Sequence, residues 1–378
     1  MCPFVLQYKW VMKMICPRCL NEDPQYFYQI QDRYYCRKCI HYGHQETFIQ
    51  LTYPNQNVDY HLQYELTKEQ KRIAFQILKR YQKKKDTVVK SVTGSGKTEM
   101  IYPVIKYALN QGHKVCFTTP RKALTQELAM RIEKQFTGIK PVIVYGGHSK
   151  QVDGQFIICT THQLFRYRHC FDLLILDEFD AFPYAGNNEL QAMLKTSIKG
   201  HYVMMSATNQ ESDLLLKRRY HGHDLPVPKS IVVPDIFSYF MMMKLLKRYR
   251  ASKKPVLIFV PTIKDIKPVV KFLKVVGFKV YGVSSQTENI KHHLELLKEN
   301  LYDALITTTI LERGMTVKNI QVIVMKGAHP IYDCPTLIQI AGRVGRVVPF
   351  NEGEVIILSY FKTKEIRQCI KEIKALNA

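Results

Sequence analysis

The sequence has no apolar run long enough to cross a membrane. No stretch approaches the roughly 18 consecutive uncharged apolar residues that a spanning helix requires. The apolar run from Phe4 to Ile15 is interrupted by Lys9 and Lys13, and it lacks a small-residue cleavage site. We therefore expect neither a membrane span nor a signal peptide.

Acidic residues are also scarce, because 32 Asp and Glu accompany 55 Lys and Arg and leave a formal net charge of +23. The charge is uneven, with +1 on residues 1–60 and +11 on each of residues 61–231 and 232–378. The two large segments are therefore expected to bind a polyanion such as nucleic acid. A basic surface that only favours solubility is the alternative. A hydrophobic content of 46% supports real cores, and 378 residues suffice for two or three domains.

The cysteines do not follow the pattern of a disulfide framework. Six of the ten are scattered, which together with a nucleotide motif indicates a reducing cytosol. The other four form two Cys-x-x-Cys pairs, a spacing that predicts a tetrahedral site for structural zinc. A redox pair of dithiols is the alternative. Aromatic residues between the pairs predict two strands of a zinc ribbon. Because the net charge of this segment is near zero, we expect its tyrosines to stack on nucleic acid rather than its charges to bind it electrostatically. The predicted zinc ligands are Cys16, Cys19, Cys36 and Cys39.

Residues 88–104 place a phosphate-binding loop between a β-branched strand and a helical pattern. Its glycines allow backbone N–H groups to surround phosphate oxygens; Lys97 would reach the β- and γ-phosphates of ATP, and Thr98 would hold Mg²⁺. Ser91 stands where the full pattern has glycine, and a glycine-rich turn with a surface lysine is the alternative. The residues predicted to bind nucleotide here are Thr93, Gly94, Ser95, Gly96, Lys97 and Thr98.

The flanks of the loop carry further expectations. Residues 53–63 are polar and predict a linker, and Thr67 predicts the N-cap of the next helix. Gln70 on this helix is placed to read adenine through its amide. Pro103 falls inside the helix after the loop, which it is expected to kink or shorten.

Apolar strands then alternate with amphipathic helices, which predicts a parallel sheet covered by helices. One strand ends in Asp177 and Glu178, where Asp177 would hold Mg²⁺ through water and Glu178 would activate the attacking water. A solvated acidic loop is the alternative. Ser206-Ala-Thr closes another strand and could couple nucleotide state to the rest of the molecule. The predicted strands are residues 114–119, 142–145, 156–160, 173–176 and 202–205.

A second α/β alternation begins near residue 232 and lacks a phosphate loop of its own. Its Arg343 and Arg346 are three residues apart, which predicts one helix face that directs both guanidinium groups at a γ-phosphate. A surface arginine pair is the alternative. The predicted strands are residues 256–260, 279–283, 304–308, 322–325 and 354–358.

The order of these motifs over residues 64–360 resembles that of superfamily 2 helicases and translocases. The stretches from Gly96, Asp177 and Ile310, with a preceding Cys₄ element, are more specifically similar to the ComFA family, the competence ATPases of Gram-positive bacteria. PriA helicases resemble the motor, but their zinc region is inserted within it. The motif series comprises Gln70, the Lys97 loop, Thr119-Pro-Arg121, Thr160-Thr-His-Gln, Asp177-Glu178-Phe-Asp180, Ser206-Ala-Thr, Arg313-Gly314 and Gln339 with Arg343 and Arg346.

The resemblance implies two tandem RecA-like domains, at residues 61–231 and 232–378, after a zinc module at residues 1–60. It implies an ATP-driven motor on single-stranded DNA in natural transformation, located in the cytoplasm near the membrane DNA channel. Other competence proteins would be its partners, and whether it forms an oligomer is left open. By position, Lys97, Asp177, Glu178, Arg343 and Arg346 would support hydrolysis. Gln70 and Gly314 would contact nucleotide, and the residues along the strand path would be Arg121, Thr161 and Thr309.

Three rival functions remain open at this point. The same motor would serve a strand-separating helicase in replication restart or repair. A zinc-dependent nucleic-acid-binding scaffold with a vestigial motor would retain binding without hydrolysis. An RNA motor is the third, since sugar preference cannot be read from these motifs.

Overall fold

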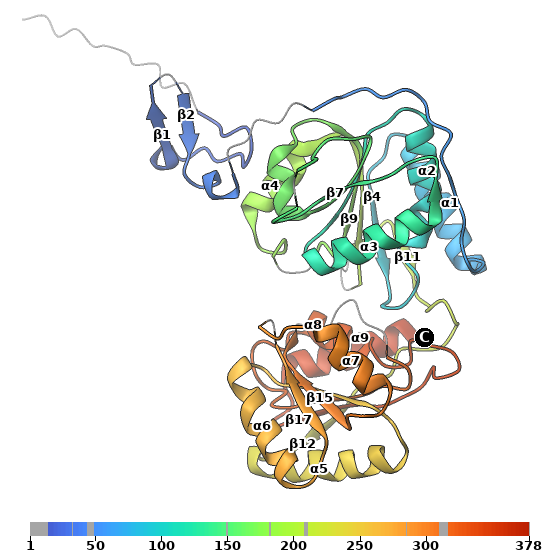
Figure 1. Ribbon diagram of the computed structural model, residues 1–378, viewed down its shortest axis with the longest axis vertical. Helices are drawn as coiled ribbons and strands as arrows, with labels where there is room; N and C mark the ends of the chain where they lie inside the picture. Colours follow the sequence, from blue (N-terminus) through green and yellow to red (C-terminus); the bar gives the residue numbers. More distant parts are fainter. Residues whose placement is uncertain are drawn as a thin grey trace, which may run out of the picture. The chain divides into compact units, whose positions relative to one another are not determined.

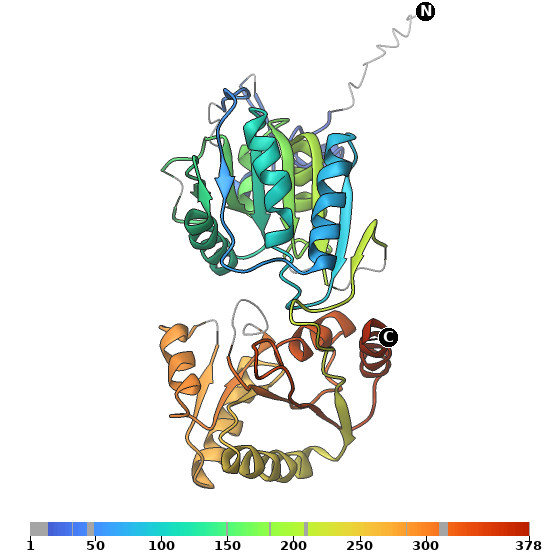
Figure 2. The same ribbon diagram turned by 90° about the vertical axis from the view of Figure 1, so that its right-hand side faces the viewer.

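The computed structural model describes residues 14–31, 33–43, 49–148, 150–180, 183–207, 211–284, 286–309 and 317–377 (Figures 1 and 2). The described chain contains two large sheets covered by helices and a small hairpin module at the N-terminal side. The two α/β layers predicted from the alternating pattern are therefore confirmed. The predicted residue Gly314 lies outside the described residues.

The first sheet has seven strands in the order β11-β4-β10-β9-β5-β8-β7. The pairs β11–β4, β9–β5, β5–β8 and β8–β7 are parallel. Its strands β5 and β8 are buried along their whole length because helices cover the sheet, as expected for a parallel sheet. Its strands are β4 (Thr87–Ser91), β5 (Val115–Thr119), β7 (Val142–Val144), β8 (Phe156–Thr160), β9 (Phe171–Asp177), β10 (Ile198–Ser206) and β11 (Leu214–Leu216).

The second sheet has six strands in the order β12-β17-β16-β13-β15-β14, and its five neighbouring pairs are all parallel. Successive side chains of a strand point to opposite faces, so Leu257 and Ile258 enter separate hydrophobic cores. The strands are β12 (Lys229–Val232), β13 (Val256–Phe259), β14 (Val280–Val283), β15 (Ala304–Thr307), β16 (Gln321–Val324) and β17 (Val355–Ser359).

Helices cover both faces of the second sheet (Figure 1). The core with Ile258 includes α5 (Asp235–Ala251) and α6 (Ile263–Val275), whereas the core with Leu257 includes α7 (Ile290–Lys298), α8 (Cys334–Ala341) and α9 (Lys364–Asn377). The helices of the first layer are α1 (Lys68–Gln82), α2 (Tyr102–Asn110), α3 (Lys122–Gln135) and α4 (Asn188–Ser197). Short 3₁₀ helices are η1 (Pro24–Tyr26), η2 (Ile40–Tyr42), η3 (Glu99–Ile101) and η4 (Thr161–Arg166).

The N-terminal module contains the predicted pair of short strands, β1 (Phe27–Ile30) and β2 (Arg33–Cys36), which pair antiparallel. It packs against the first α/β layer, because the Arg18 carbonyl accepts a hydrogen bond from Thr196 Oγ1 at 3.1 Å. The Tyr42 and His162 rings lie 6.0 Å apart, which places η2 beside η4. The module is therefore docked on the surface formed by η4 and α4.

The predicted linker at residues 53–63 is partly ordered structure. Strand β3 (Asp59–Tyr60) pairs antiparallel with β6 (Phe136–Thr137), and the Val58 backbone exchanges two hydrogen bonds with the Asn110 side chain. The strand is too short to produce an alternating apolar pattern, so composition alone indicated a loop.

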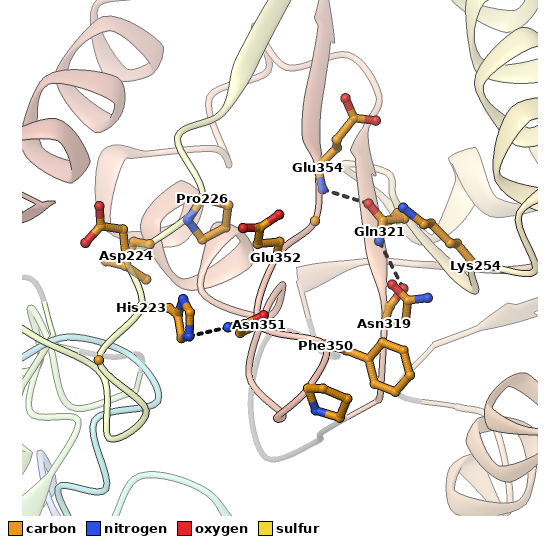
Figure 3. Close-up of a pocket in the computed structure, with 14 residues that line it drawn as sticks. His223, Asp224, Pro226, Lys254, Asn319, Gln321, Phe350, Asn351, Glu352 and Glu354 are labelled. Carbon is orange, nitrogen blue, oxygen red and sulfur yellow. Dashed lines mark hydrogen bonds between the residues drawn. The ribbon is translucent and has the colours of Figure 1, made fainter. Parts of the chain in front are cut away.

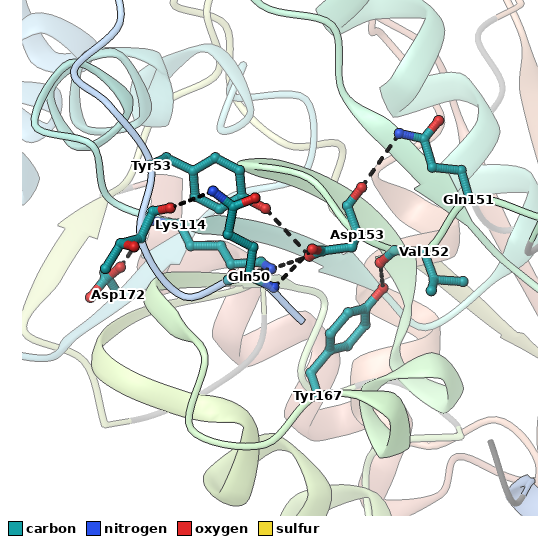
Figure 4. A network of polar contacts seen from close by, with 9 residues as sticks. Gln50, Tyr53, Lys114, Gln151, Val152, Asp153, Tyr167 and Asp172 are labelled. Carbon is teal, nitrogen blue, oxygen red and sulfur yellow. Dashed lines mark hydrogen bonds and ion pairs between the residues drawn. The ribbon is translucent and has the colours of Figure 1, made fainter. Parts of the chain in front are cut away.

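Upstream of β3, a polar network fixes the same segment to the first layer (Figure 4). Lys114, whose side chain is fully buried, donates to the Gln50 carbonyl at 2.9 Å and forms an ion pair with Asp153. Asp153 also accepts from the Gln50 backbone N–H at 2.9 Å and from the Tyr53 hydroxyl at 3.4 Å. Residues 50–61 therefore form a strap bound along the first α/β layer.

Contacts divide the chain into two compact units, and their boundary passes through the first sheet. The predicted domain boundaries at residues 60/61 and 231/232 therefore stay a prediction. Among the described residues, no helix combines the length and the apolar character needed to cross a bilayer. The nine cysteines in the described ranges are all buried, and none of them belongs to a disulfide.

Candidate nucleotide and nucleic-acid sites

The predicted phosphate loop follows β4 and has the backbone conformation that requires glycine at two positions. Gly94 and Gly96 adopt φ values of +78° and +70°. A Cβ on Gly96 would lie 2.5 Å from the Gln70 amide nitrogen, so a larger residue would displace Gln70 as well as strain the backbone. Ser91, the departure from the full pattern, is a buried strand residue without positive φ, so glycine is not needed there.

Gln70 connects the loop to the start of α1. Its amide nitrogen donates to the Ser95 carbonyl at 2.6 Å. Its amide oxygen accepts from the Thr67 backbone N–H at 2.8 Å, while the Gln70 N–H donates to Thr67 Oγ1 at 3.2 Å. This reciprocal pair is a capping box and confirms Thr67 as the N-cap. Recognition of adenine by Gln70 stays a prediction, because both the nitrogen and the oxygen of its side-chain amide form hydrogen bonds within the protein.

The loop has polar groups to offer a phosphate. The hydroxyl oxygens of Thr93 and Ser95 are buried and have no hydrogen-bond partner among the described residues. Buried hydroxyls are usually paired, and phosphate oxygens would satisfy both. The Thr98 side chain is also buried, in the position predicted to hold Mg²⁺, which prefers oxygen ligands. The residues present therefore fit a nucleotide with its metal ion.

The helix after the loop differs from the expectation at Pro103. A 3₁₀ turn, η3, follows the loop, and α2 begins only at Tyr102. Pro103 is therefore the second residue of α2, within the first turn, where a backbone N–H has no partner inside the helix. Helix α2 has nine residues, and Pro103 lies in its first turn and not in its interior.

The acidic pair lies at the end of a strand, as predicted. Asp177 is the last residue of β9, which is separated from β4 by one strand, β10. Glu178 follows with φ of +58°, a left-handed conformation that costs a residue with a Cβ about 1–2 kcal/mol. Strain of this kind concentrates at functional sites, where the surrounding structure maintains it. Roles for both carboxylates in hydrolysis stay predictions.

The predicted arrangement of the two arginines on one helix face is wrong. Helix α8 ends at Ala341, and Arg343 and Arg346 belong to the turn that follows. Gly345 has φ of +67°, a conformation that ends the helical path. We call residues 342–346 the arginine turn. Its shape, rather than helix periodicity, sets the direction of both guanidinium groups.

Arg219, which the sequence reasoning missed, holds the arginine turn. Arg219 is 2% exposed, and its guanidinium donates to the carbonyls of Val344 and Gly345 at 2.7 Å each and of Gly342 at 3.2 Å. Burial, and then the nearby Arg346, lower the pKa of Arg219 to about 9, so it stays charged at neutral pH. It is one of three basic residues in a row, and nothing local distinguishes it from exposed Arg218.

A pocket of about 780 Å³ lies beside these segments, between residues 222–226 and 349–354 (Figure 3). His223 and Asn351 form a hydrogen bond across it. Its lining includes Asp224, Glu352 and Glu354 but a single ammonium group, Lys254, so it does not present a cationic surface to a polyanion. The predicted site residues do not line it.

Two residues of the predicted strand path lie at neighbouring strand ends. Strands β5 and β8 pair in parallel register with Thr119 opposite Thr160. Arg121, which precedes α3, and Thr161, the first residue of η4, therefore lie beyond the same edge of the sheet. Thr309 follows β15 of the second sheet.

The four predicted zinc ligands come together. Their sulfur atoms all lie within 4.8 Å of one another, with 3.6 Å between Cys16 and Cys39 and between Cys19 and Cys36. Zinc–sulfur bonds of about 2.3 Å place tetrahedral sulfurs at about these separations, so the residues fit zinc. Hydrogen bonds with Cys19 and Cys39 lower the pKa of the Cys16 thiol far below its usual range and raise the pKa values of those two partners, so Cys16 is the first of the three to ionise.

Comparison with known proteins gives consistent matches. Residues 67–215 match the DEAD/DEAH box helicase model and residues 239–348 the helicase conserved C-terminal domain. Competence protein ComFA of Streptococcus pneumoniae is 34% identical over 97% of this chain and 90% of its own length. ComFA of Bacillus subtilis is 32% identical, over 96% and 85%. The solved structure of S. cerevisiae Dbp5 bound to RNA and ADP BeF3 has a TM-score of 0.58 at 17% identity, covering 83% of this chain and 92% of that one, a likeness of fold alone.

Proposed function

Since the chain belongs to the ComFA family of competence proteins and carries both helicase domains of superfamily 2, it is a nucleic-acid-dependent ATPase, and we propose that it moves along single-stranded DNA during DNA uptake in natural transformation. The two curated relatives are competence proteins matched over nearly the whole chain, so the proposal does not rest on the motor domains alone.

The observation that carries the proposal is the construction of the phosphate loop. Nucleotide binding needs glycines at positive φ, a glutamine bonded to the loop backbone, and the two buried hydroxyls that have no partner within the described part of the chain. The charge of +11 on each of residues 61–231 and 232–378 supports binding of a polyanion such as a DNA strand.

In the proposed mechanism, Lys97 binds the β- and γ-phosphates, and Glu178 orients and activates the attacking water. Mg²⁺, when bound, would be held by Thr98 and Asp177 and would neutralise phosphate charge. Arg343 and Arg346 stabilise the charge of the transition state. Arg121, Thr161 and Thr309 contact the DNA strand, and alternate gripping by the two RecA-like domains produces movement.

Zinc would be held by Cys16, Cys19, Cys36 and Cys39 and would stabilise a module too small to fold on its own core. The proposed location is the cytoplasm, at the inner face of the membrane, with other competence proteins and the DNA channel as partners. The two relatives that are competence proteins support this part of the proposal.

A displacement assay tests the proposed movement. The protein and ATP are added to a single-stranded oligonucleotide that carries streptavidin at one end, and in parallel to a partial duplex. Release of streptavidin that depends on ATP, and is lost in Lys97→Ala, supports translocation. Efficient duplex separation would favour the strand-separating helicase, and DNA binding without either activity would favour the scaffold.

A further inference from the structure

The hairpin of the N-terminal module has one face that its own core does not use. Phe27 pairs with Cys36 and Tyr28 with Tyr35. Because side chains alternate along a strand, the Phe27 and Cys36 side chains point to one face, which contains the four-cysteine cluster, and those of Tyr28 and Tyr35 point to the other.

Two further residues extend this second face. The Arg37 backbone N–H donates to the Tyr26 carbonyl at 2.7 Å, which joins the last residue of η1 to the residue after β2 at this end of the hairpin. We call Tyr26, Tyr28, Tyr35 and Arg37 the tyrosine face. It gathers three aromatic rings on a ribbon of two short strands.

The tyrosine face is exposed and carries positive charge against its rings. Tyr26 and Tyr28 are 40% and 49% exposed. The Arg37 guanidinium lies 4.6 Å from the centre of the Tyr28 ring, and the Lys38 ammonium lies 5.4 Å from that of Tyr26. Flat rings bordered by cations complement a strand of unpaired bases with phosphates between them.

We propose that the tyrosine face binds single-stranded DNA, with bases stacked on Tyr28 and Tyr26 and phosphates beside Arg37 and Lys38. The proposal rests on the proposed function, since it assumes that single-stranded DNA is the track. It assigns to the zinc module a direct role in holding that track.

The N-terminal module is attached next to residues of the predicted path of the DNA strand, so the tyrosine face would extend that path. The Arg18 guanidinium lies 5.9 Å from the centre of the Phe165 ring in η4, the element that begins with Thr161. Lys38, which borders Tyr26, forms an ion pair with Glu189 of α4 at 3.5 Å. The strap of residues 50–61 holds the same layer through the Lys114–Asp153 network (Figure 4). The tyrosine face is thus fixed to the surface that carries Thr161.

Fluorescence anisotropy of a labelled oligothymidylate, with the full-length zinc-loaded protein, tests the proposal. Loss of one stacked ring costs about 1–3 kcal/mol, or roughly 5- to 150-fold in affinity. Tyr28→Ala is therefore expected to weaken binding about tenfold, and Tyr28→Phe, which retains the ring, to bind as the wild type does. Arg37→Ala should make the slope of log affinity against log salt concentration shallower by about 1, as expected for the loss of one phosphate contact.

Tyr34→Ala is the matched control. Tyr34 is 57% exposed on the neighbouring strand β2, but it pairs with Gln29 and points to the opposite face, so its removal should leave DNA affinity unchanged. Zinc content, measured on every variant, reports whether the module is folded. If Tyr28→Ala loses zinc, Tyr26→Ala, outside the two strands, provides the same test.

Two results would overturn the proposal: wild-type affinity in both Tyr28→Ala and Tyr26→Ala with zinc retained, or an equal loss in Tyr34→Ala. Stimulation of wild-type ATP hydrolysis by single-stranded DNA separates this failure from that of the proposed function. With stimulation intact and affinities unchanged, only the tyrosine face is refuted. Without stimulation, the proposed function fails as well.

Discussion

Replacing Arg219 should slow ATP hydrolysis although the residue is expected to touch neither nucleotide nor DNA. Its guanidinium bonds three carbonyl oxygens of the arginine turn, at Gly342, Val344 and Gly345. Hydrogen bonds from charged donors contribute about 1.5–3 kcal/mol each, and the cost of burying the cation offsets much of their sum. We take about 3 kcal/mol as the net stabilisation of the turn.

Arg219→Met keeps an unbranched apolar stem but removes the guanidinium and with it every donor. The freed turn would shift Arg343 and Arg346, and a displacement of about 1 Å at a catalytic group costs about 100-fold in rate. We therefore expect kcat for DNA-stimulated hydrolysis to fall about 100-fold, with little change in the KM for ATP, because the phosphate loop is unaltered. Arg219→Lys keeps the charge but loses the planar guanidinium, so its kcat should lie between those of Arg219→Met and the wild type.

Arg218→Met is the matched control, since it removes the same charge from the adjacent, exposed position. Steady-state kinetics and thermal unfolding are measured on all three variants. If Arg219 acts through the turn, adding Arg219→Met to Arg346→Ala should cause little further loss. A fully active Arg219→Met, or an Arg218→Met that is equally impaired, would refute this reasoning.

The remaining predictions concern the acidic strand end, the zinc site and the strap. Glu178→Gln should leave ATP binding largely intact and abolish turnover; normal turnover would remove Glu178 from its proposed role. Cys36→Ser should release zinc and loosen the N-terminal module in limited proteolysis while the two α/β layers stay folded, whereas an unchanged metal content would contradict the Cys₄ assignment. Asp153→Ala should lower the free energy of unfolding by about 3 kcal/mol, measured in urea, because it leaves the Lys114 ammonium buried without its ion pair; a variant as stable as the wild type would show that the network does not stabilise the strap.

Much of the fold was visible in the sequence because its signals are local. Each predicted strand from residues 114–119 to residues 354–358 overlaps an observed strand, since continuous β-branched and aliphatic runs bounded by turns are typical of buried parallel strands. The phosphate loop and the cysteine cluster could also be predicted from the sequence, because glycine conformation and metal geometry require particular residues at particular separations.

What the sequence did not reveal depends on contacts between distant residues. The arginine turn departs from helix because Gly345 adopts positive φ, which a pattern of two arginines three apart cannot indicate. Arg219 gains its role from partners more than 120 residues away. The strap is ordered by a two-residue strand pair and by side chains such as Asn110 and Lys114, none of which changes its polar composition.

The most direct test of the account is ATP hydrolysis measured without nucleic acid, with single-stranded DNA, with duplex DNA and with RNA, alongside Lys97→Ala. The account predicts strong stimulation by single-stranded DNA that is lost in the variant. Equal or greater stimulation by RNA would contradict the DNA assignment and indicate an RNA motor. Absence of hydrolysis under every condition, with DNA binding retained, would contradict the motor itself.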